Sequence, residues 1–555
     1  MHFHTTDRIP LSPVSKENVR QEAWIARRIA DREGLARAVE VLEDLRGGFS
    51  LHQAQIRHPA PNGRLIPKPI LIQAYRSLVQ EGEWDESPEI LRRIRMKPIR
   101  TLSGVAVVTV LTQPYPCPGD CVFCPSEARM PKSYLSDEPG AMRGVQHGFD
   151  PFGQTASRLE ALREIGHPVD KVDLLILGGT WSAYPSDYQG WFIQRCLEAC
   201  NGRAADSLEA AQRENETAPS RIVGLVVETR PDAIDRSEVT QLRRLGVTKV
   251  QLGVQSLDDK LLQRNRRGHT SDDTRRGMAL LRAAGFKIAV HWMPNLLGAT
   301  LEMDRQDFAR LWNDESLRPD ELKIYPCQLL RDTDLFLAWE RGEYTPYSQE
   351  TLLDLLADLK PTIPEYCRVN RILRDIPAHH VVAGNTRSSL RQDVLAELQR
   401  RGQACRCIRC REIRAEHFEP EQLSWRELQY PAGGAREHFL SLVTPADRLA
   451  GYARLSLPGP GSPETALADL HQAALLREVH VYGQSLEVGA TEPGAAQHIG
   501  LGARLIEAAE GIARRAGYPR MAVIAALGTR GYYRRLGYVL DETYMTKSLG
   551  SHPPH

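Results

Sequence analysis

The sequence lacks any long apolar run, and it lacks an overall charge of one sign. No stretch approaches the roughly 20 apolar residues of a membrane span. The best candidate, residues 104–112, is short and rich in β-branched residues, as a buried strand is. The first ten residues hold no apolar signal-peptide core, so we expect a cytoplasmic protein without a membrane partner. Because the net charge is only +1, the global charge neither requires nor excludes a nucleic acid.

The chain has 555 residues, of which 42% are hydrophobic, so two or three domains are expected. Residues 1–100 show helical spacing of apolar positions and end in a basic segment. A solvated helix face and a phosphate-binding arm for tRNA both remain open for that segment. Its cations are Arg92, Arg93, Arg95, Lys97 and Arg100.

Residues 101–330 alternate apolar strands with helical stretches, which predicts an α/β fold with a parallel sheet and helices outside. We expect a partial (β/α) barrel of the TIM type, with its chemistry on the loops that follow the strands. The expected strands are residues 105–111, 172–179, 222–228, 249–255, 287–293 and 321–327. Residues 331–415 form a mixed linker region, and residues 416–555 read as an α+β domain with more antiparallel strands.

Three cysteines, Cys117, Cys121 and Cys124, follow the first expected strand. Three thiolates can hold three irons of a 4Fe-4S cluster and leave the fourth iron free to bind S-adenosylmethionine. Cleavage of S-adenosylmethionine there gives a 5′-deoxyadenosyl radical, which no side chain can supply. Phe123 would shield the cluster. A zinc site or a redox Cys-x2-Cys pair is the alternative interpretation.

The second expected strand ends at Gly178, Gly179 and Thr180. Glycines at a strand end allow close approach of a ligand to the backbone, here the amino acid part of S-adenosylmethionine. Most such glycine pairs are only turns, so this signal is weak alone.

A second nucleotide motif, Gln497-x-x-Gly500-x-Gly502, opens the long expected helix of residues 500–517. Its backbone N–H groups and helix dipole suit a phosphate, and the spacing differs from that of a dinucleotide-binding fold. The pattern resembles the coenzyme A loop of GNAT acetyltransferases. Tyr532 and Tyr533 follow where such enzymes place a tyrosine near the thioester sulfur. Packing at the edge of the core is the alternative for the tyrosines.

A radical S-adenosylmethionine barrel joined to a GNAT acetyltransferase domain resembles the Elongator protein 3 family over residues 95–547. The resemblance rests on "CPGDCVFCP", "DKVDLLILGGT", "VVETRPD", "QLGVQS", "RGHT", "LKIYP", "RDIP", "REVHVYG", "QHIGLG" and "GTRGYYRRLGY". It implies a tRNA-modifying enzyme. The radical would take hydrogen from the methyl group of acetyl-coenzyme A, and the resulting carbon would add to C5 of the wobble uridine in the anticodon stem-loop. Thioester hydrolysis would then leave 5-carboxymethyluridine.

The same resemblance implies roles for individual residues. Cys117, Cys121 and Cys124 would hold the cluster, although eukaryotic members space the first two more widely, and the compact form looks prokaryotic. Gly178, Gly179 and Thr180 would line the S-adenosylmethionine site. Residues matched to the acetyl-coenzyme A site are Lys171, Glu478, Val479, His480, Val481, Leu501, Gly502, Ala503 and Tyr533. Glu228 and Gln255, at expected strand ends, would touch the nucleoside. From the residues alone, Lys171 reads as a solvated lysine before a strand.

A second cysteine group, Cys405, Cys407 and Cys410, is mostly absent from eukaryotic members of that family. Three thiolates at this spacing suit a structural zinc ion with a fourth ligand from elsewhere, and unligated thiols are the alternative. The candidates for the fourth ligand are Cys327, Cys367, His291, His379 and His417.

Two competing functions remain open at this point. A protein lysine acetyltransferase would use only the GNAT domain, and a tRNA-binding scaffold would need no chemistry at all. A complete set of cluster cysteines argues against an inert barrel. The sequence leaves open whether the chain is a monomer or a homodimer.

Overall fold

The computed structural model describes residues 32–96, 104–414, 418–482 and 500–550, which form two compact units. The first unit, residues 1–100 with 160–168, is helical in its described part, as predicted. Its helices are α2 (Arg32–Arg46), α3 (Leu51–Arg57), α4 (Lys68–Gln80) and α5 (Pro88–Ile94). Ser50 caps α3 in a capping box and Ser87 caps α5, which satisfies backbone N–H groups at each helix start. A core that includes Leu42, Leu71 and Ile94 holds the helices together.

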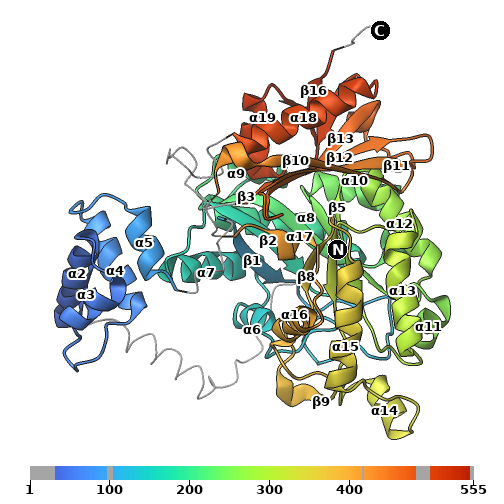
Figure 1. Ribbon diagram of the computed structural model, residues 1–555, viewed down its shortest axis with the longest axis horizontal. Helices are drawn as coiled ribbons and strands as arrows, with labels where there is room; N and C mark the ends of the chain where they lie inside the picture. The colour runs from blue at the N-terminus through green and yellow to red at the C-terminus, as the bar shows by residue number, and fades with distance from the viewer. Residues whose placement is uncertain (1–31, 97–103, 415–417, 483–499, 551–555) are drawn as a thin grey trace. The chain divides into compact units, whose positions relative to one another are not determined.

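The second unit contains a seven-stranded parallel sheet in the order β1-β2-β3-β4-β5-β6-β8, which confirms the partial barrel. Its strands are β1 (Ala106–Leu111), β2 (Lys171–Leu177), β3 (Arg221–Thr229), β4 (Lys249–Gln255), β5 (Lys287–Trp292), β6 (Glu321–Ile324) and β8 (Arg368–Arg371). Helices between the strands include α8 (Ser186–Asn201), α10 (Arg236–Arg244), α11 (Asp259–Arg264), α12 (Ser271–Ala283) and α13 (Leu301–Asn313). They cover the outside of the barrel (Figure 1). The seventh strand, β8, lies in the range that the sequence suggested as a linker.

The two faces of this sheet differ in polarity. On β2, Val172, Leu174 and Ile176 are at most 1% exposed, whereas the alternating positions are only half-buried. Asp173 pairs in register with Gly224 of β3, and a Cβ atom on Gly224 would lie 2.4 Å from the Asp173 carboxylate. Because side chains alternate along a strand, Glu228 of β3 shares that concave inner face. On β1, Val107 lies on the same face and is 46% exposed, so the inner face is open to solvent there.

A second seven-stranded sheet forms the α+β domain, in the order β10-β11-β12-β13-β14-β16-β15. Its strands are β10 (Ser424–Ala432), β11 (Ala435–Val443), β12 (Leu449–Pro458), β13 (Ala473–Val481), β14 (Arg520–Val523), β15 (Val539–Leu540) and β16 (Met545–Ser548). All neighbours are antiparallel except β13 and β14. Helix α18 (Leu501–Arg515) packs on the sheet through Leu505, Ile506 and Ala509.

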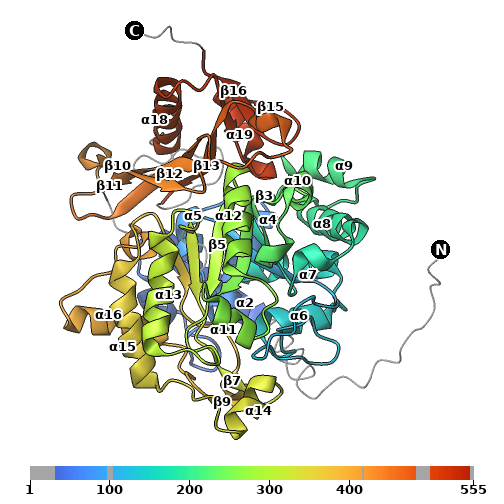
Figure 2. The same ribbon diagram turned by 90° about the vertical axis from the view of Figure 1, so that its right-hand side faces the viewer.

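The α+β domain packs against the amino-terminal ends of the barrel strands. The starts of β3 and β5 show this: a Cβ atom on Gly528 would lie 2.5 Å from that of Arg221, and Lys287 forms an ion pair with Glu478. Helix α14 (Asp334–Glu340) and the small β7–β9 pair lie at the opposite end of the barrel (Figures 1 and 2). The two domains therefore meet at one end of the barrel, and the loops after the strands lie at the other.

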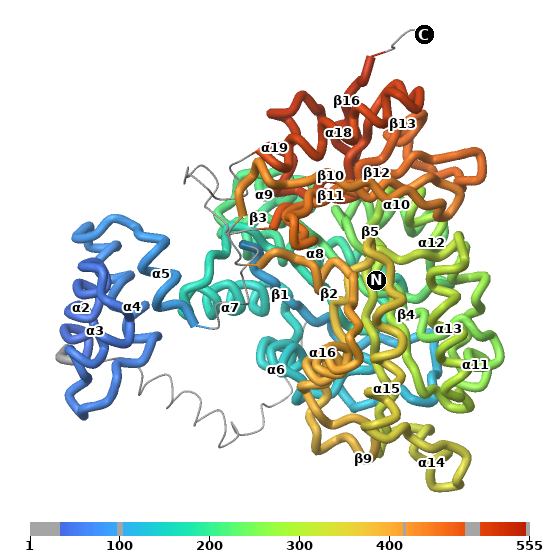
Figure 3. Tube along the Cα trace, viewed as in Figure 1, coloured from blue at the N-terminus to red at the C-terminus, as the bar shows by residue number. Residues whose placement is uncertain are grey.

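Helix α15 (Gln349–Leu359) precedes β8, and α16 (Leu390–Arg400) and the short α17 (Ile408–Arg411) lie between β8 and the second sheet. Figure 3 shows α15 and α16 side by side, and Arg401 joins them through Asp354 and Asp358. Across the described ranges, the helices are too short or too polar to cross a membrane.

Candidate functional site

The first cysteine group lies in the loop after β1, at the carboxyl end of the barrel strands. Cys121 is buried, and its Sγ accepts a hydrogen bond from Arg267 Nη1 at 2.9 Å. Cys117 Sγ accepts from the Gly119 backbone N–H at 3.4 Å. Burial, and then the neighbouring Cys121, raise the pKa of Cys124 to about 11. The loop therefore holds its thiols in place with donors from the chain itself.

The spacing of these sulfurs distinguishes a cluster from a single metal ion. Two thiolates on one zinc ion lie within about 4.6 Å of each other, because each Zn–S bond is about 2.3 Å. Among the described residues, the thiols that all gather within 4.8 Å are Cys405, Cys407 and Cys410, and the first group is not such a set. The wider spread of Cys117, Cys121 and Cys124 fits separate corners of an iron–sulfur cluster.

Buried cations surround the first cysteine group. Arg230 and Arg267 are only 5% and 6% exposed, and Arg230 Nη1 has no hydrogen-bond partner among the described residues. A Cβ atom on Gly119 would lie 2.2 Å from that Nη1, so the cysteine loop approaches Arg230 only because this residue is glycine. Burial, with Arg267 and Arg230 beside it, lowers the pKa of His269 to about 3. The positive surroundings suit a cofactor with net negative charge.

The predicted glycine pair at the end of β2 lies against the same loop. Gly178 and Gly179 have φ angles of +146° and +92°, which side chains other than glycine rarely adopt. A Cβ atom on Gly178 would lie 1.6 Å from Thr112 Oγ1. Thr180 Oγ1 is 3.6 Å from Cys117 Sγ. The structure thus brings Gly178, Gly179 and Thr180 to the cysteine loop.

Glu228 and Gln255, the two predicted nucleoside contacts, lie at the ends of β3 and β4. Tyr134 donates a hydrogen bond to Glu228 at 3.5 Å, and burial raises the pKa of this carboxyl. Gln255 has a φ angle of +68°, and its buried Oε1 has no hydrogen-bond partner among the described residues. Both side chains therefore retain polar atoms for a ligand at the carboxyl end of the barrel.

A polar network inside the barrel was not found from the sequence. His291 Nε2 lies 3.0 Å from Gln251 Oε1, which also accepts a hydrogen bond from the Lys323 ammonium. His291 Nδ1 is 3.6 Å from Glu228. Burial lowers the pKa of Lys323 to about 8, although Glu228 partly opposes this shift. One sequence signal could have revealed this network: polar residues occupy every second position of strands that are otherwise apolar.

The α+β domain presents its predicted coenzyme residues where two parallel strands part. β13 and β14 pair only over Ala473–Leu476 and Arg520–Val523, so residues 477–481 leave β14. Val479 and Val481 pack toward the core under α18. Glu478 and His480 lie on the opposite face of the strand. There Glu478 pairs with Lys287 of the barrel strand β5 and, at 2.8 Å, with Arg454 of the neighbouring strand β12. Any role of Glu478 at a thioester therefore falls to its backbone, because its side chain joins the two domains.

The residues predicted for the pyrophosphate loop lie at the start of α18, with Leu501, Gly502 and Ala503 in its first turn and Gly500 as the cap. Gln497 lies outside the described residues. A Cβ atom on Gly502 would lie 2.9 Å from the hydroxyl of Tyr532. Tyr533 is 8% exposed and packs within the core beside Tyr538. Of the two predicted tyrosines, Tyr532 thus brings its hydroxyl to the helix start.

The remaining predicted residues fall in three places. Lys171 begins β2, at the barrel end that faces the α+β domain, and burial lowers its pKa. Arg93 and Arg95 donate hydrogen bonds to the carbonyls of Leu45 and Gly166, so their side chains also hold the helical unit together. Arg92 is half-buried on α5. Lys97 and Arg100 lie outside the described residues.

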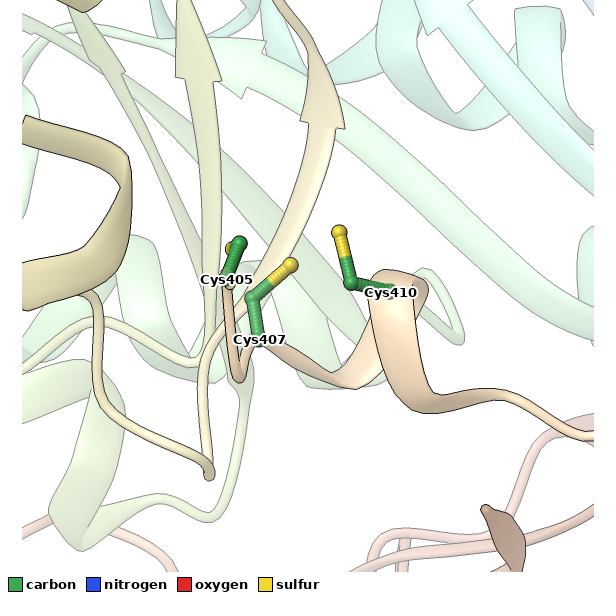
Figure 4. A group of neighbouring side chains, drawn as sticks. All are labelled: Cys405, Cys407 and Cys410. Carbon is green, nitrogen blue, oxygen red and sulfur yellow. The ribbon is translucent and has the colours of Figure 1, made fainter. Parts of the chain in front are cut away.

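The second cysteine group gathers its sulfurs tightly around α17 (Figure 4). Lys360, only 1% exposed, donates a hydrogen bond to Cys410 Sγ at 3.3 Å. Burial opposes a charge on Lys360, but the three thiols raise its pKa. Hydrogen bonds from Cys405 and Cys410 lower the pKa of Cys407 well below its usual value. This arrangement fits one metal ion.

None of the predicted fourth ligands that the structure describes belongs to this tight group. Cys367 is the candidate that interacts with the group. Burial is the main cause of the raised pKa of its thiol, and the charge of Cys407 is the second. Cys327 packs against Val122 in a separate core, and His291 lies inside the barrel. His379 bonds to Asp137, and His417 lies outside the described residues.

Comparison with known proteins agrees with this architecture. Residues 115–311 match the Radical SAM superfamily and residues 319–400 match the Radical_SAM C-terminal domain. The chain is 40% identical to the tRNA uridine(34) acetyltransferase of Methanocaldococcus infernus over 84% of this chain and 89% of that protein. It is 42% identical to the protein of that name from Dehalococcoides mccartyi, over 81% of this chain and 99% of that protein. It is 36% identical to human Elongator complex protein 3, over 83% and 87%.

A solved structure gives the same result at the level of the fold. The archaeal Methanocaldococcus infernus Elp3 with an N-terminal deletion aligns with a TM-score of 0.71 and 36% identity. The alignment covers 80% of this chain and 99% of that chain. That share of the chain is larger than the share in the two family matches, which lie within residues 115–400.

Proposed function

The chain belongs to the family of tRNA uridine(34) acetyltransferases and Elongator complex protein 3, and on this premise we propose that it makes 5-carboxymethyluridine. It is an enzyme of the radical S-adenosylmethionine type that modifies the wobble uridine of tRNA. The proposed donor of the two carbons is acetyl-coenzyme A. One observation carries the proposal: a three-thiol loop lies at one end of the barrel strands, and the domain with the residues predicted for acetyl-coenzyme A lies at the other.

When bound, the iron–sulfur cluster and S-adenosylmethionine supply a 5′-deoxyadenosyl radical able to take hydrogen from an acetyl methyl group. The chain contributes the surroundings. Arg267 holds Cys121 in place, and Arg230 adds positive charge to a buried site. Neutral His269 keeps a further positive charge out of that site at neutral pH. Cys121, Arg230 and Arg267 are buried there, which limits the access of water to reactive species.

The inner face of the barrel is the proposed route between the two sites. β4 runs the length of the barrel in seven residues, so its ends are about 20 Å apart at about 3.3 Å per residue. Lys171 stands at the start of β2, and the Lys323 ammonium, which shares Gln251 with His291 inside the barrel, offers N–H donors to an acetyl carbonyl. Glu228 and Gln255 stand at the far end, where the uridine would bind. Placing a base there requires it to leave its stack.

The decisive experiment is anaerobic. The protein is reconstituted with iron and sulfide, and reductant, S-adenosylmethionine, acetyl-coenzyme A and tRNA are added. We expect 5′-deoxyadenosine and 5-carboxymethyluridine. Cys121→Ala should lose both products, whereas Cys200→Ala, which removes a buried cysteine in α8, should keep them. Cluster-loaded protein that yields neither product would sink the proposal. Peptide acetylation that survives in Cys121→Ala would favour a protein lysine acetyltransferase.

The basic segment is the proposed contact with the tRNA backbone. Neutralising Arg92, Lys97 and Arg100 should weaken tRNA binding and flatten the dependence of log K on log salt by roughly one unit per lost phosphate contact. Arg93 and Arg95 are left intact, because their bonds to the carbonyls of Leu45 and Gly166 would confuse folding with binding. An unchanged salt slope would refute the contact and leave only a solvated helix face.

The second cysteine group is the proposed site of one structural zinc ion. Cys405, Cys407 and Cys410 would supply three thiolates, and Lys360 is the proposed fourth donor, its ammonium releasing a proton to solvent as the metal ion binds. Lys360→Ala should weaken zinc retention at least tenfold, and Lys360→Met preserves the packing volume without a donor. Equal zinc retention in Lys360→Met and the parent would show that the amine only pairs with the thiols.

A further inference from the structure

Three side chains outside both sites converge on one point near the carboxyl end of the barrel. His379 and His380 form the short turn after β8, and Asp137 lies in the segment that follows the cysteine loop. His380 Nε2 lies 2.8 Å and His379 Nε2 2.9 Å from the same oxygen, Asp137 Oδ2. The two imidazole rings lie 4.2 Å apart between centroids, at 40° to each other. All three ligand atoms fall within 4.8 Å of one another.

Hydrogen bonding alone leaves this group incomplete. Asp137 Oδ1 is shielded from solvent and has no hydrogen-bond partner among the described residues. A solvent-shielded acceptor without a partner is unfavourable. The guanidinium of the nearby Arg374 donates to Ser133 Oγ at 2.7 Å and to Glu138 at 2.8 Å instead of to Asp137. A cation held by both oxygens of the Asp137 carboxylate, with the two histidines at Oδ2, would also pair Oδ1.

We propose that Asp137, His379 and His380 bind one divalent transition-metal ion, with Zn²⁺ as the best match. Two imidazole nitrogens and a carboxylate are the donor set that zinc and its neighbours in the first transition row accept, whereas Mg²⁺ and Ca²⁺ prefer oxygen alone. A ring that binds the ion through Nε2 carries its one remaining proton on Nδ1. His379 has a side chain that is 70% exposed, so water can complete the coordination.

The ion would fasten the segment after the third cluster cysteine to the segment after β8. Cys124 begins the stretch that reaches Ser133 and Asp137, and the Ser133 backbone N–H bonds to the Pro125 carbonyl at 3.1 Å. Arg374 already ties Ser133 and Glu138 to the segment that carries the two histidines. The metal site therefore extends an existing clamp on the cysteine loop. Its role is structural, and the radical chemistry does not require it.

Zinc counting on the full-length, cluster-loaded protein tests the site. The protein is equilibrated anaerobically with a small excess of ZnCl₂, desalted, and analysed for zinc and iron separately by mass spectrometry. His379→Ala/His380→Ala should retain one zinc fewer per chain than the parent. The matched control, His52→Ala/His471→Ala, removes two exposed histidines elsewhere and should retain the full amount. Thermal melting in the absence of added zinc checks that each variant folds.

Two further measurements make the test specific. Asp137→Asn keeps the shape of the side chain, removes its charge, and should weaken zinc binding at least tenfold in competition with a fluorescent chelator. X-ray absorption at the zinc edge should show nitrogen and oxygen ligands in the parent that His379→Ala/His380→Ala lacks. Equal zinc content in that variant and the parent overturns the proposal. An equal loss in the His52→Ala/His471→Ala control overturns it too, because the binding would then be non-specific.

Discussion

Arg477 is the residue whose loss should most damage the joint between the barrel and the α+β domain. Its guanidinium is fully buried and donates to both oxygens of Asp320, to Glu437 at 2.7 Å and to the Phe286 carbonyl at 2.7 Å. Asp320, which precedes β6, is also 0% exposed. Arg477→Met keeps the length and packing of the side chain but leaves two buried carboxylates short of a partner.

The cost follows from where these charges lie. Removing one member of a buried ion pair costs about 3–5 kcal/mol, since the remaining charge cannot be solvated. Arg454 and Arg282 also approach Asp320, at 3.4 Å and 3.8 Å, so we expect the lower part of this range. A loss of about 3 kcal/mol corresponds to a shift of more than a hundredfold in the unfolding equilibrium.

The assay is urea unfolding of the apparent first transition, followed by near-ultraviolet circular dichroism at low and high salt. A two-domain chain need not unfold in two states, so the parent and variants are compared under identical conditions. Arg401→Met is the control, because Arg401 contacts three carboxylates at a more exposed site and its loss should cost much less stability than that of Arg477. The Arg477→Met effect should not change with salt. A loss below about 1 kcal/mol, or one that salt abolishes, would refute the buried-charge reasoning.

The same cluster sets a pH dependence with a definite sign. Burial raises the pKa of Asp320, but the guanidiniums of Arg477, Arg454 and Arg282 outweigh it and bring the pKa down to about 2. Since the folded value is below the usual 3.8, the stabilisation is present above pH 3.8 and disappears as the pH falls toward 2. In Arg477→Met, the free energy of unfolding should fall less steeply between pH 3.8 and pH 2 than in the parent.

Three further predictions concern the two sites. Lys323→Met should reduce formation of modified uridine at least tenfold. In the parent, this rate should decline above pH 8, because the Lys323 ammonium loses its proton near a pKa of about 8, and Lys323→Met should remove the decline. A decline that remains in Lys323→Met would exclude Lys323 as its source. Tyr532→Phe should raise the KM for acetyl-coenzyme A several-fold more than Tyr533→Phe does, because the Tyr532 hydroxyl lies at the start of α18. A larger effect of Tyr533→Phe would mean that Tyr533 contacts the coenzyme instead. Gly502→Val should abolish acetyl-coenzyme A binding by placing a branched side chain within about 3 Å of Tyr532, while 5′-deoxyadenosine still forms; coenzyme binding that persists in equilibrium dialysis would contradict this.

The barrel was largely readable from the sequence because six of its strands are apolar runs of the right length. β8 was not, since in Arg368–Arg371 only Val369 is fully buried and the other positions are polar. A strand at the end of the sheet, with a partner on one side only, needs less apolar character. The apolar pattern of the sequence therefore predicted the central strands of the sheet but not its edge strand β8.

The candidate sites divided in a similar way. Cysteine spacing and the glycine-rich helix start were visible because each motif is continuous in the chain. The contact of Arg267 with Cys121 joins residues 146 positions apart, and the ion pair of Lys287 with Glu478 joins residues 191 positions apart. Periodicity in the sequence cannot predict contacts between residues so far apart. Lys360 was missed as a candidate zinc ligand for another reason, because the sequence argument considered only thiols and imidazoles.

The geometry of the barrel places a constraint on any mechanism for this chain. The carboxyl ends of parallel strands carry the cysteine loop, while the α+β domain meets the amino ends, so the two chemistries are separated by the height of the sheet. In the proposed reaction, a small shift between the domains would move the acetyl group relative to a short-lived radical. The joint is correspondingly built from Asp320, Arg454 and Arg477, buried charges that pair in only one arrangement. An apolar joint of equal area could slide, whereas breaking these pairs leaves charges without water or partner. The buried ions therefore fix the register between the barrel and the α+β domain.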